Sequence, residues 1–580
     1  MSVLLRTHKP GPCDSPSNRK EKKNEKIHQD SIKTPSQDSI PRLHLKISRL
    51  HLKTPSRLPQ VPLDFLKTPS KAAMEAKQDV QAVDVAIVGG GPTGLFTGLL
   101  LHRMGVSVCI LDAKPKCLEL GRADAMNART QQYFEVAKIL HGLLPLGLKC
   151  NTSSTFAHGE FKSRQNKWWV SLEHTLHKNF LMLGQPVIEK LLSSELGGLV
   201  HYGEQVVSIS EHDESVEVVT SSGRRVRSRY AVGADGARSA VRKHMGVGFS
   251  GTKPEMVWAV LDTFIDTDFP VCPEIITFEM EGQSRVSWIP RERGLSRFYV
   301  LLDGEVSQER AQASIKEHMA PHRVEFQETE WYSTFEVKER VASCFLSRDG
   351  RGRIVLAGDA AHVHSVNGGQ GLNTGVADAF SLAWRLAAVV SSPSTLKPDA
   401  ADKLLRSYDI ERRGTAQGVV DVAAALVRDT VREAKQYVGT IEKNAGYITG
   451  MGVSYADFDS PLIRTSKHGI WTAGCPCPDV VLLNRGRSTR LYSEVCYGKH
   501  LVLLIGNHAS TEFGHQKAAV SYQIHPLGES TSEASGAKIF KADWASQEDS
   551  FVVVVRPDMY IGHVGKDAAS CRRFLDEIYA

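Results

Sequence analysis

The chain has 580 residues, with 71 Lys and Arg against 65 Asp and Glu and a net charge of +6. Residues 1–80 hold 16 basic and 8 acidic residues, so the rest of the chain is slightly acidic and its charge gives no argument for nucleic-acid binding, which we do not expect. No run of about 18 apolar residues occurs, which excludes a membrane-spanning helix, and the ten cysteines form no Cys-x-x-Cys pair. We therefore expect a soluble protein of the cytoplasm.

Residues 1–80 form a basic and repetitive segment. The sequence Lys-Thr-Pro-Ser recurs at 33–36, 53–56 and 67–70, and apolar periodicity is missing. Such a segment buries too little apolar surface to offset the entropy of ordering. We expect a disordered tail, which is either a targeting segment or a dispensable extension.

A glycine-rich motif follows the first predicted strand. Residues 83–88 are largely β-branched and lead into Gly89, Gly91 and Gly94, after which 95–104 predicts a helix. In this pattern the first glycine permits a tight turn, the second lets a pyrophosphate approach the backbone, and the third allows close packing of helix on strand. The motif predicts a dinucleotide site.

A second strand, 106–111, ends at Asp112, whose carboxylate can accept hydrogen bonds from a ribose. NAD proteins and FAD proteins share this unit, so it leaves the identity of the dinucleotide open.

Two further motifs lie far along the chain. A predicted strand over 230–235 ends in Asp235-Gly236, and a strand over 353–356 leads into Gly358-Asp359 and the glycine-rich segment 368–375. Three such motifs in this order describe one elongated dinucleotide held by distant pieces of a scaffold. FAD is the simplest candidate.

At these three motifs, over about 81–430, the chain resembles the FAD-dependent aromatic hydroxylases, which include phenol hydroxylase, and in particular members of the fungal secondary-metabolism type. In that family, residues matching Asp359 and Gln185 bind the ribityl chain, and one matching Arg122 contacts the FAD phosphates. The Asp-Gly pair lies near FAD and NADPH. The resemblance implies this cofactor-binding set: Gly89, Gly91, Gly94, Asp112, Arg122, Gln185, Asp235, Gly236, Gly358, Asp359, Gly371, Leu372 and Asn373.

Leu372 and Asn373 are predicted to begin a helix that runs to about residue 386. Their unpaired N–H groups would face the negative charge that reduced flavin develops at N1. Relatives commonly have Pro where this chain has Val366.

His362 and His364 have no evident third ligand, so we predict no metal site.

The resemblance also suggests the catalytic residues. The segment 289–299 resembles the phenol hydroxylase segment that lines the substrate pocket, which implies Arg291 and Tyr299, and 121–124 matches the segment that carries the active-site Asp, here Asp124. Asp124 would be the base, Tyr299 the hydrogen-bond partner of the substrate oxygen, and Arg291 the charge that steadies substrate and flavin. A phenol is ionised to only about one part in 10³ at neutral pH, so a base is useful.

The resemblance implies an FAD- and NADPH-dependent monooxygenase that hydroxylates a phenolic or polyketide-derived aromatic substrate with dioxygen, through a flavin C4a-hydroperoxide. Two kinds of alternative remain open. One is a flavin oxidase, dehydrogenase or ring-cleaving oxygenase on the same scaffold, and the other is a flavin-binding assembly protein without catalysis.

The predicted fold class is α/β: a Rossmann-like FAD-binding domain with an inserted antiparallel substrate sheet, then a thioredoxin-like C-terminal α/β domain that serves structure or homodimer formation. Alternating segments predict the sheet, and the Arg-Pro-Asp end of a strand near 551–555 resembles the C-terminal domain of phenol hydroxylases. The expected order is a tail at 1–80, the FAD-binding domain at 81–246 and 346–470, the substrate sheet at 247–345 and the C-terminal domain at 471–580.

Overall fold

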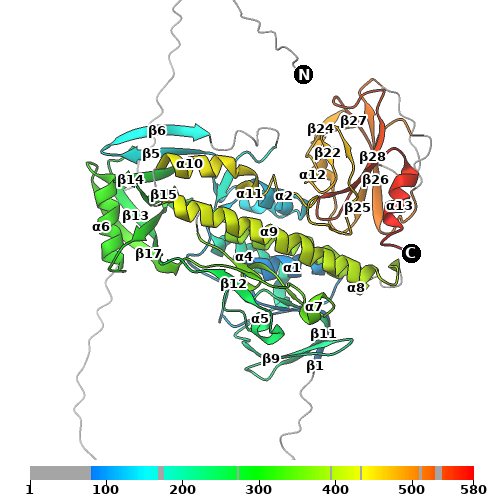
Figure 1. Cartoon of the computed structure of the whole chain (residues 1–580), viewed down its shortest axis with the longest axis horizontal. Coiled ribbons are helices and arrows are strands. Elements are labelled where there is room, and N and C mark those ends of the chain that lie inside the picture. The colour runs from blue at the N-terminus through cyan, green and yellow to red at the C-terminus, as the bar shows by residue number, and fades with distance from the viewer. Residues whose placement is uncertain are drawn as a thin grey trace, which may run out of the picture. The chain divides into compact units, whose positions relative to one another are not determined.

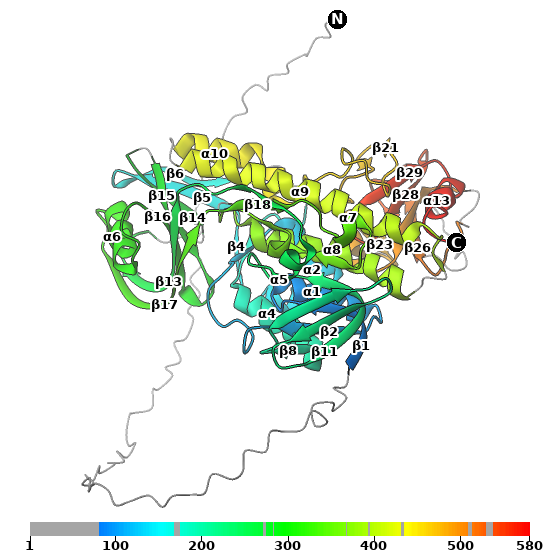
Figure 2. The same cartoon turned by 60° about the horizontal axis from the view of Figure 1, so that its bottom comes forward.

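The computed structural model of the chain is shown in Figures 1 and 2. Of the expected tail, only Val80 lies within the described residues. Those residues are 80–167, 175–270, 274–281, 283–366, 368–391, 395–430, 434–508, 513–528 and 538–580.

A seven-stranded sheet in the order β8-β2-β1-β11-β10-β9, with β19 also beside β11, forms the centre of the FAD-binding domain. Five of its strands are parallel, so the loops that follow β1, β11 and β19 leave the same edge of the sheet. The strands are β1 (Val80–Val88), β2 (Val108–Asp112), β8 (Val200–Tyr202), β9 (Val206–Glu211), β10 (Val216–Thr220), β11 (Arg225–Gly233) and β19 (Ile354–Leu356).

The helices of this domain pack on one another as well as on the sheet. α1 contacts both α4 and α8, and the long α9 contacts α8 and reaches strands of the substrate side (Figure 1). They are α1 (Pro92–Arg103), α2 (Ala128–Val136), α3 (Leu140–Leu143), α4 (Gln185–Leu196), α5 (Ala240–Met245), α7 (Ser347–Gly350), α8 (Gln370–Ser391), α9 (Ala400–Thr430), α10 (Ala434–Lys443) and α11 (Ala445–Thr449).

The substrate sheet has seven strands in the order β17-β13-β16-β15-β14-β5-β6. α6 (Gln308–Met319) covers one of its faces (Figure 2). The strands are β13 (Val257–Thr267), β14 (Ile275–Met280), β15 (Gln283–Pro290), β16 (Ser296–Leu302), β17 (Val324–Glu336), β5 (Thr152–Ala157) and β6 (Glu160–Lys167). The hairpin β5-β6 lies outside the expected range 247–345. It belongs to this sheet because β5 pairs in parallel with β14.

The chain also forms two small sheets of three strands each. One has the order β3-β7-β4 and the other the order β12-β18-β20. Their strands are β3 (Ala125–Met126), β4 (Leu148–Cys150), β7 (Phe180–Met182), β12 (Phe249–Thr252), β18 (Glu339–Ala342) and β20 (His362–Val363). β3 begins directly after Asp124.

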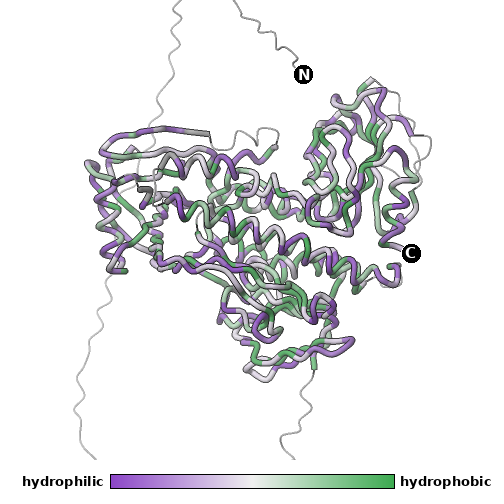
Figure 3. Tube along the Cα trace, in the orientation of Figure 1, coloured by the Kyte–Doolittle hydropathy of each residue, from purple (hydrophilic) through white to green (hydrophobic). Residues whose placement is uncertain are grey.

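The C-terminal domain is built on a mixed sheet in the order β24-β23-β27-β26-β25-β28-β29. β25 is parallel to β26 and antiparallel to β28. The fully apolar runs in β25 and β28 appear as green segments in Figure 3. The elements are β23 (Val481–Asn484), β24 (Arg487–Arg490), β25 (His500–Gly506), β26 (Ala519–Pro526), β27 (Lys538–Ala542), β28 (Ser550–Val555), β29 (Ile561–Gly565), α12 (Leu491–Glu494) and α13 (Ala568–Leu575), with the short strands β21 (Lys467–His468) and β22 (Trp471–Thr472) before them.

Within the described ranges, no helix is both long enough and apolar enough to cross a membrane. The same part of the chain contains no group of three or more His, Cys, Asp or Glu that could hold a metal ion. The expected homodimer and the expected cytoplasmic location stay predictions.

Candidate active site

A cavity of about 710 Å³ opens at the edge of the sheet where the loops after β1, β11 and β19 meet. All three sequence motifs contribute to its wall, together with aromatic side chains of the substrate sheet. Its lining includes Gly91, Pro92, Thr93, Arg122, Asp124, Gln185, Asp235, Gly236, Arg238, Tyr299, Trp331, Phe335, Asp359, His364, Gln370, Gly371 and Leu372.

The glycines of the first motif differ in what surrounds them. Gly89 has a φ of +113°, and a Cβ there would lie 2.2 Å from the carbonyl oxygen of Ala234. A Cβ on Gly94 would lie 1.9 Å from the carbonyl oxygen of Gly89. A Cβ on Gly91 would meet no atom within 4 Å, because Gly91 faces the cavity. Gly89 and Gly94 are therefore required by close backbone packing, whereas Gly91 leaves space in the cavity.

Gly91→Ala is therefore expected to fold normally and to bind FAD about 5- to 100-fold more weakly, because only the cofactor would meet the new methyl group. Its φ of −85° suits alanine. FAD titration followed by flavin fluorescence checks this, with Gly198→Ala as the control, since a Cβ there also meets no atom within 4 Å but lies outside the cavity lining. Equal FAD affinity in the two variants would contradict the predicted role of Gly91.

The third motif packs against the first through Thr93. A Cβ on Gly358 would lie 2.6 Å from Thr93 Oγ1, and one on Gly375 would lie 2.3 Å from the same atom. Gly358 also donates its N–H to Asp378 Oδ2 at 2.8 Å. These contacts fix the turn that presents Asp359 to the cavity.

Asp359 is an exposed residue of the cavity wall, and the folded protein packs around its carboxyl group on the side away from the cavity opening. This burial raises the pKa of Asp359, and the nearby Asp378 carboxylate adds to the rise, while His362 and Arg122 oppose it. The charged form of Asp359 therefore destabilises the folded protein. A ligand that donates hydrogen bonds to this carboxylate would offset the destabilisation.

Asp359→Asn should raise the stability of the FAD-free protein at neutral pH and lower FAD affinity by about 10- to 100-fold. Because the pKa is raised above its ordinary value of 3.8, the folded wild type holds the proton more tightly, and its stability falls as pH rises through the folded pKa. Urea unfolding of the apo-protein between pH 4 and 8 and FAD titration measure the two effects. A variant that is less stable and binds FAD as well as the wild type would contradict both.

In the second motif, one carboxylate oxygen of Asp235 accepts hydrogen bonds from the protein and the other has no partner among the described residues. Asp235 Oδ2 accepts hydrogen bonds from the N–H groups of Ala240 at 2.6 Å and Val241 at 3.2 Å, at the start of α5. Asp235 Oδ1 is buried and finds no hydrogen-bond partner among the residues that the structure describes. Gly236, with a φ of +80°, completes the turn.

The other predicted cofactor residues lie in different positions. Arg122 and Gln185 line the cavity, and the Gln185 amide also joins Ala123 and Glu189 through hydrogen bonds of 3.2 and 2.7 Å. Asp112 does not line it: its carboxylate accepts hydrogen bonds from the N–H groups of Gly90 at 2.5 Å and Lys114 at 2.7 Å.

Gly371 and Leu372 line the cavity in the first turn of α8. The side chain of Asn373 does not reach this wall and instead joins α8 to β3, by donating to Ala125 O at 3.0 Å and accepting from Asn127 N at 2.9 Å. The backbone N–H groups of this first turn lack partners within the helix.

The chemistry of the wall fits FAD. Helix α8 begins at one end, an open glycine lies at the start of α1, and the arginines Arg122 and Arg238 stand near two acceptor carboxylates. Arginines and helix N-termini suit a pyrophosphate, and carboxylates suit hydroxyl groups. The roles of the individual residues stay predictions.

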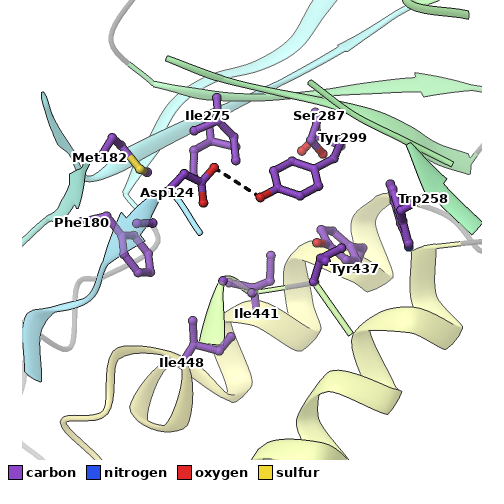
Figure 4. Close-up of a pocket in the computed structure, with 16 residues that line it drawn as sticks. Asp124, Phe180, Met182, Trp258, Ile275, Ser287, Tyr299, Tyr437, Ile441 and Ile448 are labelled. Atoms are coloured by element: carbon purple, nitrogen blue, oxygen red, sulfur yellow. Dashed lines mark hydrogen bonds between the residues drawn. The ribbon is translucent and has the colours of Figure 1, made fainter. Parts of the chain in front are cut away.

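A second, smaller cavity of about 110 Å³, whose lining residues are drawn in Figure 4, shares part of its wall with the first. Asp124, Ala125, Tyr299, Val366 and Gly369 line both. Its other walls are mostly apolar and come from the substrate sheet, β7, α10 and α11. They include Phe180, Met182, Trp258, Ile275, Thr277, Ser287, Ile289, Tyr437, Ile441 and Ile448.

Asp124 and Tyr299 contact each other at the boundary between the two cavities. Tyr299 Oη donates a hydrogen bond to Asp124 Oδ2 at 3.3 Å, as Figure 4 shows. Burial raises the pKa of Tyr299, and the Asp124 carboxylate raises it further, although Arg297 lowers it. Tyr299 is therefore a neutral hydrogen-bond donor at physiological pH.

Arg297, which the sequence analysis did not single out, is the arginine nearest to Asp124 among the described residues. Its Nη1 lies 3.5 Å from Asp124 Oδ2, while Nε and Nη2 bind the Asp262 carboxylate at 2.6 and 2.5 Å. Burial opposes the charge, yet Asp124 and Asp262 outweigh it and raise the pKa of Arg297. Arg297 and Tyr299 are two residues apart on β16, so their side chains share a face of the sheet.

Arg291 lines neither cavity. Its guanidinium binds the Glu292 carboxylate at 2.7 and 2.9 Å and lies 3.4 Å from Asp262 Oδ1. Arg291 and Arg297 both bind Asp262, and the contact of Arg291 with substrate and flavin stays a prediction.

A model of the FAD binding domain family matches residues 82–423. An FAD-dependent monooxygenase of Aspergillus terreus is 33% identical over 69% of this chain and 61% of its own length. A 3-hydroxybenzoate 4-monooxygenase of Comamonas testosteroni is 29% identical, with 68% of each chain covered. Among solved structures, an anhydrotetracycline hydroxylase of Streptomyces rimosus superposes with a TM-score of 0.67 at 25% identity, covering 86% of this chain and 99% of that one.

The chain therefore belongs to the FAD binding domain family, and FAD is its cofactor. The expected resemblance to flavin-dependent monooxygenases and the expected fold class are confirmed.

Proposed function

We propose that the protein is an FAD-dependent monooxygenase that hydroxylates a phenolic substrate and takes its electrons from NADPH. The observation that carries the proposal is the position of Asp124 and Tyr299 on the wall shared by the FAD cavity and the small apolar cavity. The names of the relatives, a hydroxybenzoate monooxygenase and an anhydrotetracycline hydroxylase, support the aromatic substrate.

A phenol bound in the small cavity would place its hydroxyl group at these two side chains. The Asp124 carboxylate would accept the phenol proton, and Tyr299 would donate a hydrogen bond to the oxygen that becomes negative. Since a phenolate ring is far richer in electrons than a phenol ring, this proton transfer activates the carbon that receives oxygen. Such a base contributes about 10² to 10⁴ in rate.

Arg297 would keep the Asp124 carboxylate in position. Its charge is shared between Asp124 and Asp262, so the Asp124 carboxylate lies beside a cation that is itself held in place. The apolar walls exclude water from the reacting ring. FAD, once reduced, would supply the activated oxygen, and the first turn of α8 would stabilise negative charge on its ring system.

The size of the small cavity favours a substrate with one aromatic ring. The small cavity has about 110 Å³, less than the roughly 150 Å³ that is known to hold benzene, so even a one-ring phenol would extend into the adjoining larger cavity. We therefore expect one-ring phenols to be better substrates than polyketides with several fused rings.

The test is to purify the protein, record the flavin absorbance, and follow NADPH oxidation and product mass with one-ring phenols and multi-ring aromatic compounds. Phenol-stimulated NADPH oxidation with one added oxygen atom in the product supports the proposal. Flavin turnover without oxygen insertion would point to an oxidase or dehydrogenase, and flavin without any turnover would indicate an assembly protein.

A further inference from the structure

A cluster of seven ionisable side chains lies buried where α2, α8 and α9 meet the C-terminal domain. Each of the seven is at most 2% exposed. We call this set the junction cluster, and its members are Arg129, Arg385, Arg412, Arg556, Asp378, Glu411 and Asp558.

Three arginines of the junction cluster are balanced by its three carboxylates. Arg412 Nε lies 2.7 Å from Asp378 Oδ1, and Arg385 Nη2 lies 2.7 Å from Glu411 Oε2. Arg556 binds Glu411 at 2.6 Å and Asp558 at 2.6 Å. These six groups sum to zero charge.

Arg129 is left over. It donates hydrogen bonds to neutral groups only: Gln132 Oε1 at 2.8 Å, Tyr492 Oη at 2.6 Å and Met559 O at 2.9 Å. Within the described ranges it forms no ion pair with a carboxylate. The seven residues of the junction cluster therefore sum to one positive charge.

The tyrosines around Arg129 do not supply the missing negative charge. The guanidinium lies 4.7 Å from the ring centre of Tyr133 and 5.0 Å from that of Tyr560. Burial raises the pKa values of Tyr492 and Tyr560 well above their ordinary range, so both stay neutral. Their rings reduce the cost of the buried cation but leave its charge uncompensated.

A chamber of about 30 Å³ lies beside this excess charge. Two of its lining residues have polar atoms without a hydrogen-bond partner in the part of the chain described: Arg129 Nε, and both amide atoms of Gln370. Arg129 is 2% exposed and Gln370 is 3% exposed. Arg412, Asn373, Thr374 and Tyr560 also line the chamber.

We propose that the chamber binds a small monovalent anion of the halide class, which neutralises the charge on Arg129 and accepts hydrogen bonds from Arg129 Nε and the Gln370 amide. Water would satisfy the donors but leave the charge uncompensated, which is costly in the interior. The chamber has room for one or two particles of water size, so it excludes phosphate and sulfate. The chamber shares Gln370 with the FAD cavity and Ile448 with the small cavity, but neither Asp124 nor Tyr299 lines it.

The decisive test is a crystal of the full-length holoprotein soaked in sodium bromide and measured at the bromine absorption edge. We expect an anomalous peak in the chamber, within contact distance of Arg129 Nε. Density in the chamber without anomalous signal would show ordered water only and would overturn the proposal.

Thermal unfolding provides the second test and uses matched variants. In sodium chloride, compared with sodium gluconate at equal ionic strength, the unfolding midpoint of the wild type should rise saturably by about 2 to 4 °C. Arg129→Met should lose this dependence. Arg490→Met is the control, because Arg490 is paired with Glu135 and Asp479 and its loss should lower the midpoint while the chloride dependence remains. The same chloride dependence in wild type and Arg129→Met would overturn the proposal, and if Arg129→Met does not fold, the bromide result decides.

Discussion

Asp124→Asn is expected to hydroxylate phenols about 10²- to 10⁴-fold more slowly than the wild type at pH 7, with its FAD content unchanged. The amide has nearly the shape of the carboxylate and can still accept the hydrogen bond of Tyr299, which lies 3.3 Å away. It cannot accept the phenol proton. Stopped-flow measurement of single turnovers with a one-ring phenol, alongside flavin content from the visible spectrum, tests this.

The pH profile separates loss of the base from loss of structure. Without a base, the rate should follow the fraction of phenol that ionises by itself, so the rate of the variant should climb about tenfold per pH unit toward the phenol pKa of about 10. The matched control is Tyr299→Phe, which keeps the carboxylate and loses one hydrogen bond, so its rate should fall only about tenfold or less. A variant that turns over at the wild-type rate at pH 7, or whose rate stays equally low up to pH 10, would contradict the role of Asp124 as base.

The position of the FAD site could be predicted from the sequence because each motif follows a parallel strand. Strands that share a direction end at the same edge of a sheet, so Gly91, Asp235 and Asp359 meet there although they are far apart in the chain. Asp112 also follows such a strand. Its side chain turns to the N–H groups of Gly90 and Lys114, which the strand pattern does not reveal.

The substrate side was predicted less completely, because it depends on contacts between distant segments. Strand β5 joins the substrate sheet by pairing with β14, and no local pattern shows such a pairing. The resemblance drew attention to Arg291, whereas the two-residue period of β16 would have placed Arg297 on the face of Tyr299. Tyr437 and Ile441 line the small cavity because α10 folds back over it, which the helical pattern alone does not indicate.

Glu411→Gln is expected to lower the free energy of unfolding by about 3 to 5 kcal/mol, because it leaves buried arginines beside a neutral partner. Glu411 is fully buried on α9 and accepts hydrogen bonds from Arg385 at 2.7 Å and from Arg556 at 2.6 and 2.7 Å. Ser460 donates to it at 2.5 Å. Since Arg556 belongs to the C-terminal domain, the same change should loosen that domain from α8 and α9. Urea unfolding and limited proteolysis measure the two effects.

The control for this change is Glu119→Gln, which breaks an exposed pair with Lys116 whose side chains are 65% and 66% exposed. A surface pair contributes less than about 1 kcal/mol, so this variant should unfold like the wild type. Equal stabilities of the two variants would contradict the role of Glu411. The junction cluster gives a second way to test Glu411. Removing a carboxylate raises the excess positive charge of the cluster, so the unfolding midpoint of Glu411→Gln should depend more strongly on chloride than that of the wild type. The midpoint of Arg129→Met should not depend on chloride. Opposite changes in two variants of one buried cluster are expected from its charge and not from a general loss of packing.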